Sequence, residues 1–240
     1  MSQGGRFNAI ALERVVFGRP AAEVVPGELE RLGRSRACLL VSHSLRTRTS
    51  EVSDLEEALG GAAVGTYSGM PPHTPREAVI ECAALARETR ADIIVTLGGG
   101  SLTDAGKVVQ LCLEHDVTEP EGLEPFVTRT TADGRVESPA IQAPRVRQLT
   151  LPTTLSGGEF GFSAGCTDST RRIKQAYRHP LFVPQVVVRS TAPTTFWRSS
   201  NLPLEVNANY ADGRYKLAGA STFRSCPVIG PGPKSISTTM

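Results

Sequence analysis

The stretch Ile93-Ile94-Val95-Thr96-Leu97-Gly98-Gly99-Gly100-Ser101-Leu102-Thr103-Asp104-Ala105-Gly106-Lys107 joins an apolar run to three glycines and a serine. The run has the length of a buried strand, and apolar residues at helical spacing predict a helix from about Leu102 to Glu114. Glycines let a backbone approach a ligand, and the free amides at a helix start favour an anion. We therefore expect a diphosphate-binding turn. A tight turn that binds nothing is the alternative, because a glycine-rich turn alone is a weak signal.

Two well-known phosphate loops do not fit this stretch. A P-loop would require glycine at Ser101 and a hydroxyl residue at Val108. The G-x-G-x-x-G fingerprint would require glycine at Thr103. The turn is therefore expected to be a third kind of phosphate loop.

Further apolar runs alternate with helical stretches on both sides of this turn. Continuous apolar strands without polar alternation are typical of a parallel sheet that is covered on both faces. The sequence therefore predicts an α/β fold, a doubly wound and mostly parallel sheet. Residues 116–147, rich in Pro, Thr, Glu and Gly, are expected to form an excursion loop or a small hairpin. Strands are expected at residues 15–17, 37–41, 62–67, 93–97, 148–151 and 186–188, a helix end at 28–32, and a helix at 75–87.

A second motif, Leu151-Pro152-Thr153-Thr154-Leu155-Ser156-Gly157-Gly158-Glu159, follows a predicted strand. Its three hydroxyl groups and two glycines lie where a strand ends. Hydroxyl groups at that edge of a sheet can bind phosphate or ribose oxygens. Standing alone, the segment would be interpreted as an ordinary Ser/Thr turn.

Composition excludes several classes of protein. The 26 basic and 24 acidic side chains leave a net charge of +2, which gives no reason to expect binding to nucleic acid or to an acidic membrane surface. Aromatic residues make up 5%, too few to suggest base stacking. The N-terminus has no long apolar run, so neither a signal peptide nor a membrane anchor is expected.

The five cysteines are far apart and form no C-x-x-C pair. Zinc ribbons and disulfide frameworks need closer or paired spacing. Free thiols in a reducing compartment are the better interpretation, and a cytoplasmic location is expected.

In this order, the two motifs resemble those of the iron-type alcohol dehydrogenases, a family that includes glycerol dehydrogenases and maleylacetate reductases. The resemblance extends from about residue 16 to about residue 188, and Phe160 with the run Lys174–Pro180 resembles the maleylacetate-reductase-like branch. It implies a dehydroquinate-synthase-like dinucleotide-binding domain over residues 1–188. It also implies an NAD- or NADP-dependent oxidoreductase that interconverts alcohol and carbonyl, or reduces maleylacetate-like enone acids.

The resemblance implies cofactor-binding roles for the two motifs and for one later lysine, but assigns no catalytic residue. The glycine turn would bind the diphosphate, and Asp104 would lie near the nicotinamide side of the cleft. Lys107 would support the loop or the phosphates. Lys174 would reach the nicotinamide ribose, although a solvated lysine is an equal alternative. The implied residues are Gly98, Gly99, Gly100, Ser101, Asp104, Lys107, Thr153, Thr154, Ser156 and Lys174.

The choice between NAD and NADP stays open. Val41, at the end of the second predicted strand, is followed by Ser42-His43-Ser44. An acidic residue at that place binds the adenosine ribose of NAD and repels a 2′-phosphate. No carboxylate stands there, so either cofactor is compatible with the sequence.

The metal ligands that the resemblance implies have no counterpart in this sequence. The resemblance implies a divalent iron or zinc ion held by an aspartate, a histidine four residues later and two further histidines. The four histidines here, His43, His73, His115 and His179, all precede that region, and no D-x-x-x-H occurs. No metal ligand is therefore predicted. Residues 189–240 are expected to be a divergent, partly disordered tail, with one helix at about 210–220, in place of the helical metal-binding domain.

Three explanations for this tail compete. The gene product is truncated, with a shifted or mis-spliced end; or it is a remnant that is no longer catalytic; or it is a dinucleotide-binding module that regulates a full-length relative. An abrupt loss of resemblance followed by low-complexity residues favours the first. The expected partner is a small-molecule substrate, with a homodimer possible.

The purified chain is expected to bind no stoichiometric iron or zinc and to show little dehydrogenase activity alone. A site of this kind needs three or four protein ligands in defined geometry. Elemental analysis measures the metal content. About one metal per chain, removable by a chelator with loss of activity, would show that ligands do exist.

Overall fold

The computed structural model describes residues 11–190, 214–215 and 224–225. The chain divides into two units, residues 1–192 and 193–240. In the second unit, β11 (Arg214–Tyr215) pairs antiparallel with β12 (Arg224–Ser225). The helix predicted at 210–220 is wrong at residues 214–215, where two residues pair as a strand, and its remainder lies outside the described residues.

The first unit is built on a six-stranded sheet in the order β1-β10-β7-β4-β2-β3, with all neighbours parallel. The predicted doubly wound sheet is confirmed. Every residue of β2, β4 and β10 is buried, which explains why these strands are apolar without alternation. The strands are β1 (Arg14–Phe17), β2 (Ala37–Val41), β3 (Ala63–Tyr67), β4 (Ile93–Gly98), β7 (Arg147–Pro152) and β10 (Val186–Arg189).

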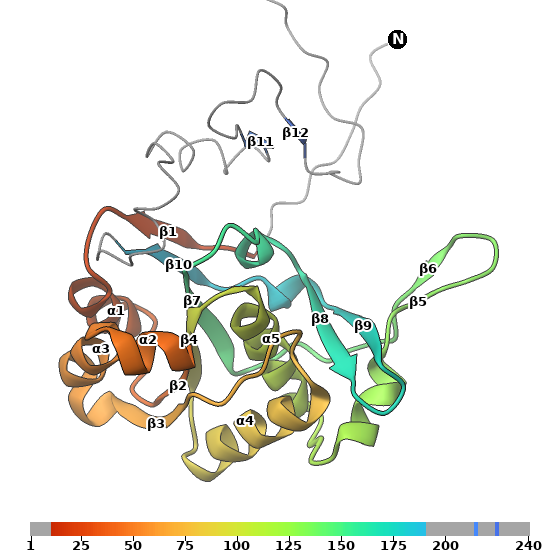
Figure 1. Ribbon diagram of the computed structural model, residues 1–240, viewed down its shortest axis with the longest axis horizontal. Coiled ribbons are helices and arrows are strands. Elements are labelled where there is room, and N and C mark those ends of the chain that lie inside the picture. The colour runs from red at the N-terminus through yellow and green to blue at the C-terminus, as the bar shows by residue number, and fades with distance from the viewer. Residues whose placement is uncertain (1–10, 191–213, 216–223, 226–240) are drawn as a thin grey trace, which may run out of the picture. The chain divides into compact units, whose positions relative to one another are not determined.

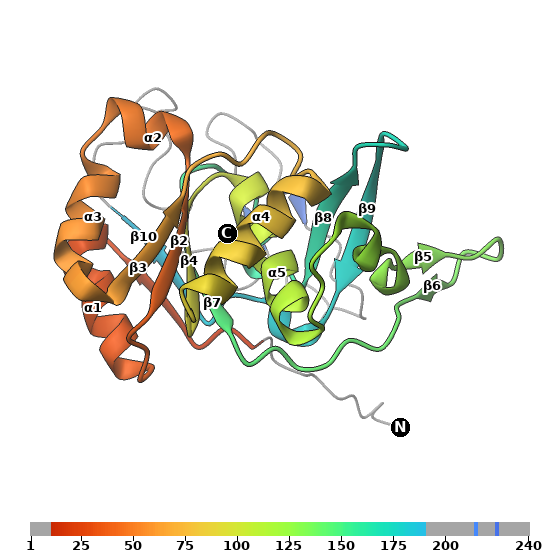
Figure 2. The same ribbon diagram turned by 90° about the horizontal axis from the view of Figure 1, so that it is seen from below.

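Helices cover both faces of this sheet (Figures 1 and 2). One face packs against α1 (Ala21–Arg31), α2 (His43–Arg48) and α3 (Glu51–Leu59), and the other against α4 (Arg76–Glu88) and α5 (Gly100–Glu114). Each face has its own apolar core, because side chains alternate between the faces along each strand. In β2, Leu39 belongs to the first core and Leu40 to the second.

Two hairpins lie on the α5 side of the sheet, beyond that helix (Figure 2). The predicted excursion contains the 3₁₀ helix η2 (Pro120–Phe126) and a short hairpin of β5 (Arg129–Thr130) and β6 (Val136–Glu137). A second hairpin, β8 (Ser163–Asp168) with β9 (Ile173–Arg178), packs on α5 and was not expected from the sequence. The remaining elements are the 3₁₀ turns η1 (Gly60–Ala62), η3 (Gly158–Phe160) and η4 (Pro180–Phe182).

The described cysteines are free thiols, as expected. Cys38, Cys82, Cys112 and Cys166 are all buried, and burial raises the pKa of each thiol. Cys226 lies outside the described residues. Among the described residues, no helix is long and apolar enough to span a membrane.

Helix α5 lies unusually close to the sheet at Gly106. A Cβ at this position would lie 2.6 Å from Gln148 Nε2 and 2.8 Å from Thr96 Cγ2. These side chains form a buried polar layer, in which Gln148 Nε2 donates to Thr96 Oγ1 (2.9 Å) and Thr96 Oγ1 donates to Thr150 Oγ1 (2.8 Å). The glycine therefore sets the distance between α5 and the strands beneath it.

Replacing Gly106 by alanine is expected to destabilise the fold. Alanine gains about 1 kcal/mol of helix propensity, but its methyl group must displace buried strand side chains, and overpacking costs about 1–3 kcal/mol. The control is Gly27→Ala in α1, where an added Cβ meets no atom within 4 Å. That change is expected to stabilise the protein by about 0.5–1 kcal/mol. Urea unfolding measures both, and equal gains in stability would contradict the prediction.

Candidate functional site

The glycine turn lies at the point where the order of the strands reverses. From β2 the chain moves to β3 on one side, and α4 then returns it to β4 on the other. In open α/β sheets, ligands bind outside the carboxyl ends of the strands at such a point. Ser42, which follows β2, donates its amide to Leu97 O at 2.9 Å. The ends of β2 and β4 therefore form one edge, and Gly98 stands on it.

The two sequence motifs lie against each other at this edge. β4 and β7 are neighbours, and the amide of Thr153 donates to Gly98 O at 2.9 Å. A Cβ on Gly99 would lie 3.1 Å from Thr154 Cγ2, and a Cβ on Gly100 would lie 3.0 Å from Ser156 Oγ. Side chains on these glycines would fill the space between the turn and the hydroxyl groups. The result is a cradle of backbone faced by hydroxyls, which fits a ligand held close to the main chain.

The start of α5 completes the cradle electrostatically. Gly99 is the N-cap, and the first intrahelical bonds run from Leu102 and Thr103 to Gly99 O. The amides of Gly100 and Ser101 precede those bonds and lie at the positive end of a 15-residue helix. Such amides bind anions, and phosphate groups in particular.

Asp104 and Lys174, distant in sequence, are brought together by the β8–β9 hairpin. Asp104 Oδ2 accepts a hydrogen bond from the amide of Gly165 (3.1 Å) and lies 3.9 Å from Lys174 Nζ. Burial raises the pKa of the Asp104 carboxyl, and the cations of Lys107 and Lys174 oppose that rise. Lys174 crosses Gly165 so closely that any Cβ there would lie 2.1 Å from its Cε.

Lys107 contacts the backbone at and after the end of the second motif. Its side chain is fully buried, and Nζ donates to the carbonyl oxygens of Gly158 (2.6 Å) and Ser163 (3.0 Å). Desolvation lowers the pKa of Lys107 to about 8, against the opposing carboxylates of Asp104 and Glu159. The resemblance implies that Lys107 supports either the loop or the phosphates. Hydrogen bonds to two backbone carbonyls fit support of the loop.

Sequence reasoning did not identify the ion pair that anchors the second motif. Glu159 is fully buried, and its Oε1 accepts from Arg189 Nη1 at 3.1 Å, which ties the loop to the end of β10. Burial raises the pKa of this carboxyl. Two features of the sequence could have indicated this ion pair: Glu159 is the last residue of the second motif, and Arg189 ends an apolar strand.

A second missed feature precedes α4. The amide of His73 donates to Ser101 Oγ at 3.1 Å, and Thr74 Oγ1 donates to Ser101 O at 3.0 Å. This turn therefore contacts the diphosphate loop predicted from the sequence. No motif marked it.

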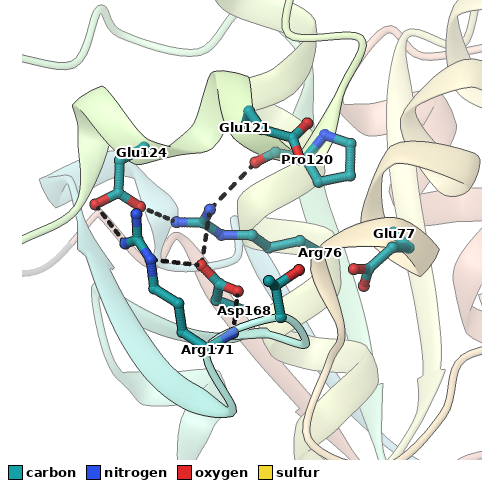
Figure 3. Close-up of a pocket in the computed structure, with 8 residues that line it drawn as sticks. Arg76, Glu77, Pro120, Glu121, Glu124, Asp168 and Arg171 are labelled. Atoms are coloured by element: carbon teal, nitrogen blue, oxygen red, sulfur yellow. Dashed lines mark hydrogen bonds and ion pairs between the residues drawn. The ribbon is translucent and has the colours of Figure 1, made fainter.

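A charged pocket of about 260 Å³ lies between the start of α4, η2 and the turn of the β8–β9 hairpin (Figure 3). Buried Arg76 lies 2.8 Å from Glu124 and 3.5 Å from Asp168, and Arg171 lies 3.1 Å from Glu124. The hydrogen bond from Arg76 is the largest of the effects that lower the pKa of Glu124 to about 2. Because these charges are paired with one another, the network serves to hold the hairpin turn against α4.

The described residues do not fit a resident metal ion. They contain no group of three or more His, Cys, Asp or Glu side chains placed to hold one. Two of the histidines accept backbone hydrogen bonds instead: His115 Nε2 from the amide of Gln142, and His179 Nδ1 from that of Leu181.

The family model for iron-containing alcohol dehydrogenase matches residues 13–191. The chain belongs to this family. It is 31% identical to "Dehydrogenase FUM7" of Gibberella moniliformis over 78% of the chain and 46% of that protein. It is 30% identical to a maleylacetate reductase of a Rhizobium species over 73% of the chain and 40% of that enzyme. The resemblance to this family and to its maleylacetate reductases is thereby confirmed.

Solved structures show the same N-terminal domain. The crystal structure of maleylacetate reductase from Agrobacterium tumefaciens aligns with a TM-score of 0.59 and 28% identity, over 79% of this chain and 43% of that one. Sulfoacetaldehyde reductase from Bifidobacterium kashiwanohense, solved in complex with NAD⁺, shares the fold at 20% identity, with a TM-score of 0.65, over 78% of this chain and 46% of that one. The chain spans less than half the length of each of these relatives.

Lys107 is expected to make stability depend on pH. Its pKa falls from 10.5 in the unfolded chain to about 8 in the folded one, so the unfolded chain binds more protons between these values. The free energy of unfolding therefore rises with pH above about 8. The buried thiols act oppositely as the pH approaches and passes 9.0, their ordinary pKa, because folding raises the pKa of each thiol.

Urea unfolding between about pH 7 and 9 isolates the lysine when variants are compared, because the thiols contribute equally to all of them. We expect the free energy of unfolding to rise less with pH in Lys107→Met than in wild type, whereas Lys174→Met, at a lysine whose side chain is 52% exposed, should keep the slope of wild type. Equal slopes for wild type and Lys107→Met would refute the prediction.

Proposed function

We propose that the chain binds NAD or NADP across the carboxyl ends of β2, β4 and β7, as the dinucleotide-binding half of an oxidoreductase. The reaction is interconversion of alcohol and carbonyl, or reduction of a maleylacetate-like enone acid. The observation that carries this proposal is the glycine turn at the strand-reversal point, with the Thr154 and Ser156 side chains across from it. The relative solved with NAD⁺ supports it, because the two share this fold.

Each part of the edge would contact a different part of the cofactor. The backbone of Gly98, Gly99 and Gly100 and the hydroxyl of Ser101 would hold the diphosphate. Thr153, Thr154 and Ser156 would donate to phosphate or ribose oxygens. Asp104 and Lys174 pair beside the β8–β9 hairpin, and this side of the cleft would take the nicotinamide and its ribose. The nicotinamide, when bound, supplies or accepts the hydride.

The identity of the substrate and the binding of a metal depend on more than the described residues. The family uses a metal, and the described residues do not supply its ligands, so no step of this proposal involves one. A small-molecule substrate, a homodimer and a cytoplasmic location complete the proposal; free thiols, as found at the four described cysteines, are typical of reducing compartments.

The second candidate function is a non-catalytic dinucleotide-binding module or a regulator of a full-length relative. Metal-dependent turnover of NADH with a panel of carbonyl substrates separates the two.

Gly99→Asp is expected to weaken NADH and NADPH binding by at least about tenfold, equivalent to about 1.4 kcal/mol. The new side chain would enter the cradle, where even its Cβ lies 3.1 Å from Thr154 Cγ2, and its carboxylate would repel the diphosphate. Fluorescence titration measures the affinity for each cofactor. Gly27→Asp adds the same charge on α1, in open space, and is expected to bind as wild type does. Unchanged titration of Gly99→Asp would contradict the proposed site.

A further inference from the structure

Two consecutive residues before α4 hold a backbone conformation that their side chains disfavour. His73 has φ +67° and Thr74 has φ +57°, although neither is glycine. Thr74 is also β-branched, which makes the left-handed region a genuine outlier for it. Such conformations persist only where the surroundings over-determine them, and they cluster at functional sites.

This turn lies between two segments, the start of α5 on one side and β8 on the other. On one side, the His73 amide donates to Ser101 Oγ (3.1 Å) and Thr74 Oγ1 donates to Ser101 O (3.0 Å). On the other, Thr167 donates its amide to Thr74 O (2.8 Å) and its hydroxyl to His73 O (2.7 Å). Thr74 is fully buried between them. The turn therefore joins the start of α5 to β8 through four hydrogen bonds.

The hydrogen bond from His73 determines what the Ser101 hydroxyl can do. A serine hydroxyl has one proton and two lone pairs. The His73 amide occupies a lone pair, so the proton must point elsewhere. No acceptor for that proton is found within residues 11–190. It therefore remains available to a ligand that presents acceptor oxygens at the start of α5, as a diphosphate does.

We propose that the His73–Thr74 turn is a positioning element that orients the Ser101 hydroxyl as a donor to the cofactor's diphosphate. His73 and Thr74 act through Ser101 and are positioning residues. Thr74 fixes the Ser101 backbone, His73 fixes its side chain, and Thr167 holds the turn in its strained form. The inference rests on the proposed function, because it requires the diphosphate at this turn.

The first test removes one hydrogen bond at constant shape. Thr74→Val keeps the β-branching and loses the donor to Ser101 O, and it is expected to weaken NADH binding by about fivefold. Thr74→Ser restores the hydroxyl and is expected to bind within about twofold of wild type. The control is Thr89→Val, which loses a hydrogen bond to Leu85 O (2.7 Å) at the end of α4 and should leave affinity unchanged. Equal affinity of Thr74→Val and wild type, or no rescue by serine, would overturn the inference.

The second test asks whether Thr74 acts through Ser101. Ser101→Ala removes the donor hydroxyl and is itself expected to weaken NADH binding. In that background, Thr74→Val should weaken binding by clearly less than it does in wild type, because the hydroxyl it would misorient is gone and only the Ser101 amide remains to be displaced. Losses that add in the double variant would indicate a merely structural role and overturn the inference.

Failure of this inference can be told apart from failure of the proposed function. If Gly99→Asp binds NADH as wild type does, the proposed site is wrong and the inference falls with it. If Gly99→Asp loses binding while Thr74→Val keeps it, the cofactor site stands and only the role of the turn is wrong.

Discussion

The close contact between α5 and the sheet is the constraint on which the candidate site depends. At Gly106 the helix backbone lies directly on Thr96 and Gln148, leaving no room for a side chain. A helix pressed this closely against β4 and β7 starts at the carboxyl ends of both strands. Its free amides therefore lie at the strand-reversal point, and a larger residue at Gly106 would move the helix and its amides away from that edge.

Helix α5 also contacts the other segments around the candidate site. Ser101 contacts the His73–Thr74 turn, Asp104 contacts the β8–β9 hairpin at Gly165, and Lys107 donates a hydrogen bond to Gly158 at the end of the second motif. These three residues follow one another at intervals of three, so they lie along one side of the helix. One helix thus places three segments that are distant in sequence. The burial of Lys107 and Asp104 costs desolvation, which explains the opposite shifts of their pKa values.

The sheet and the glycine turn could be predicted because their signals are local. Apolar runs predicted all six strands of the sheet, since burial on both faces selects apolar residues along the whole strand. Helix α3 was missed because its buried stripe, Val52, Leu55 and Leu59, is thin and lies among charged residues. The β8–β9 hairpin was missed because β8 alternates buried and less buried positions that are mostly small or polar. In the same way, nothing local connects Ser101 with His73 or Lys107 with Ser163; tertiary packing alone makes these contacts.

The cofactor and the metal of this family make different demands on a chain. A dinucleotide is held mainly by backbone amides and hydroxyls at a strand edge, and the parallel sheet builds that edge by itself. A divalent ion needs three or more side chains that converge on one point, and the described residues contain no such group. In the proposed site, the amides and hydroxyls at the edge would bind oxygen atoms of the cofactor without help from an ion. Under this proposal, dinucleotide affinity depends on the packing of α5 and on the hydrogen bonds at Ser101, and is expected to be independent of added metal.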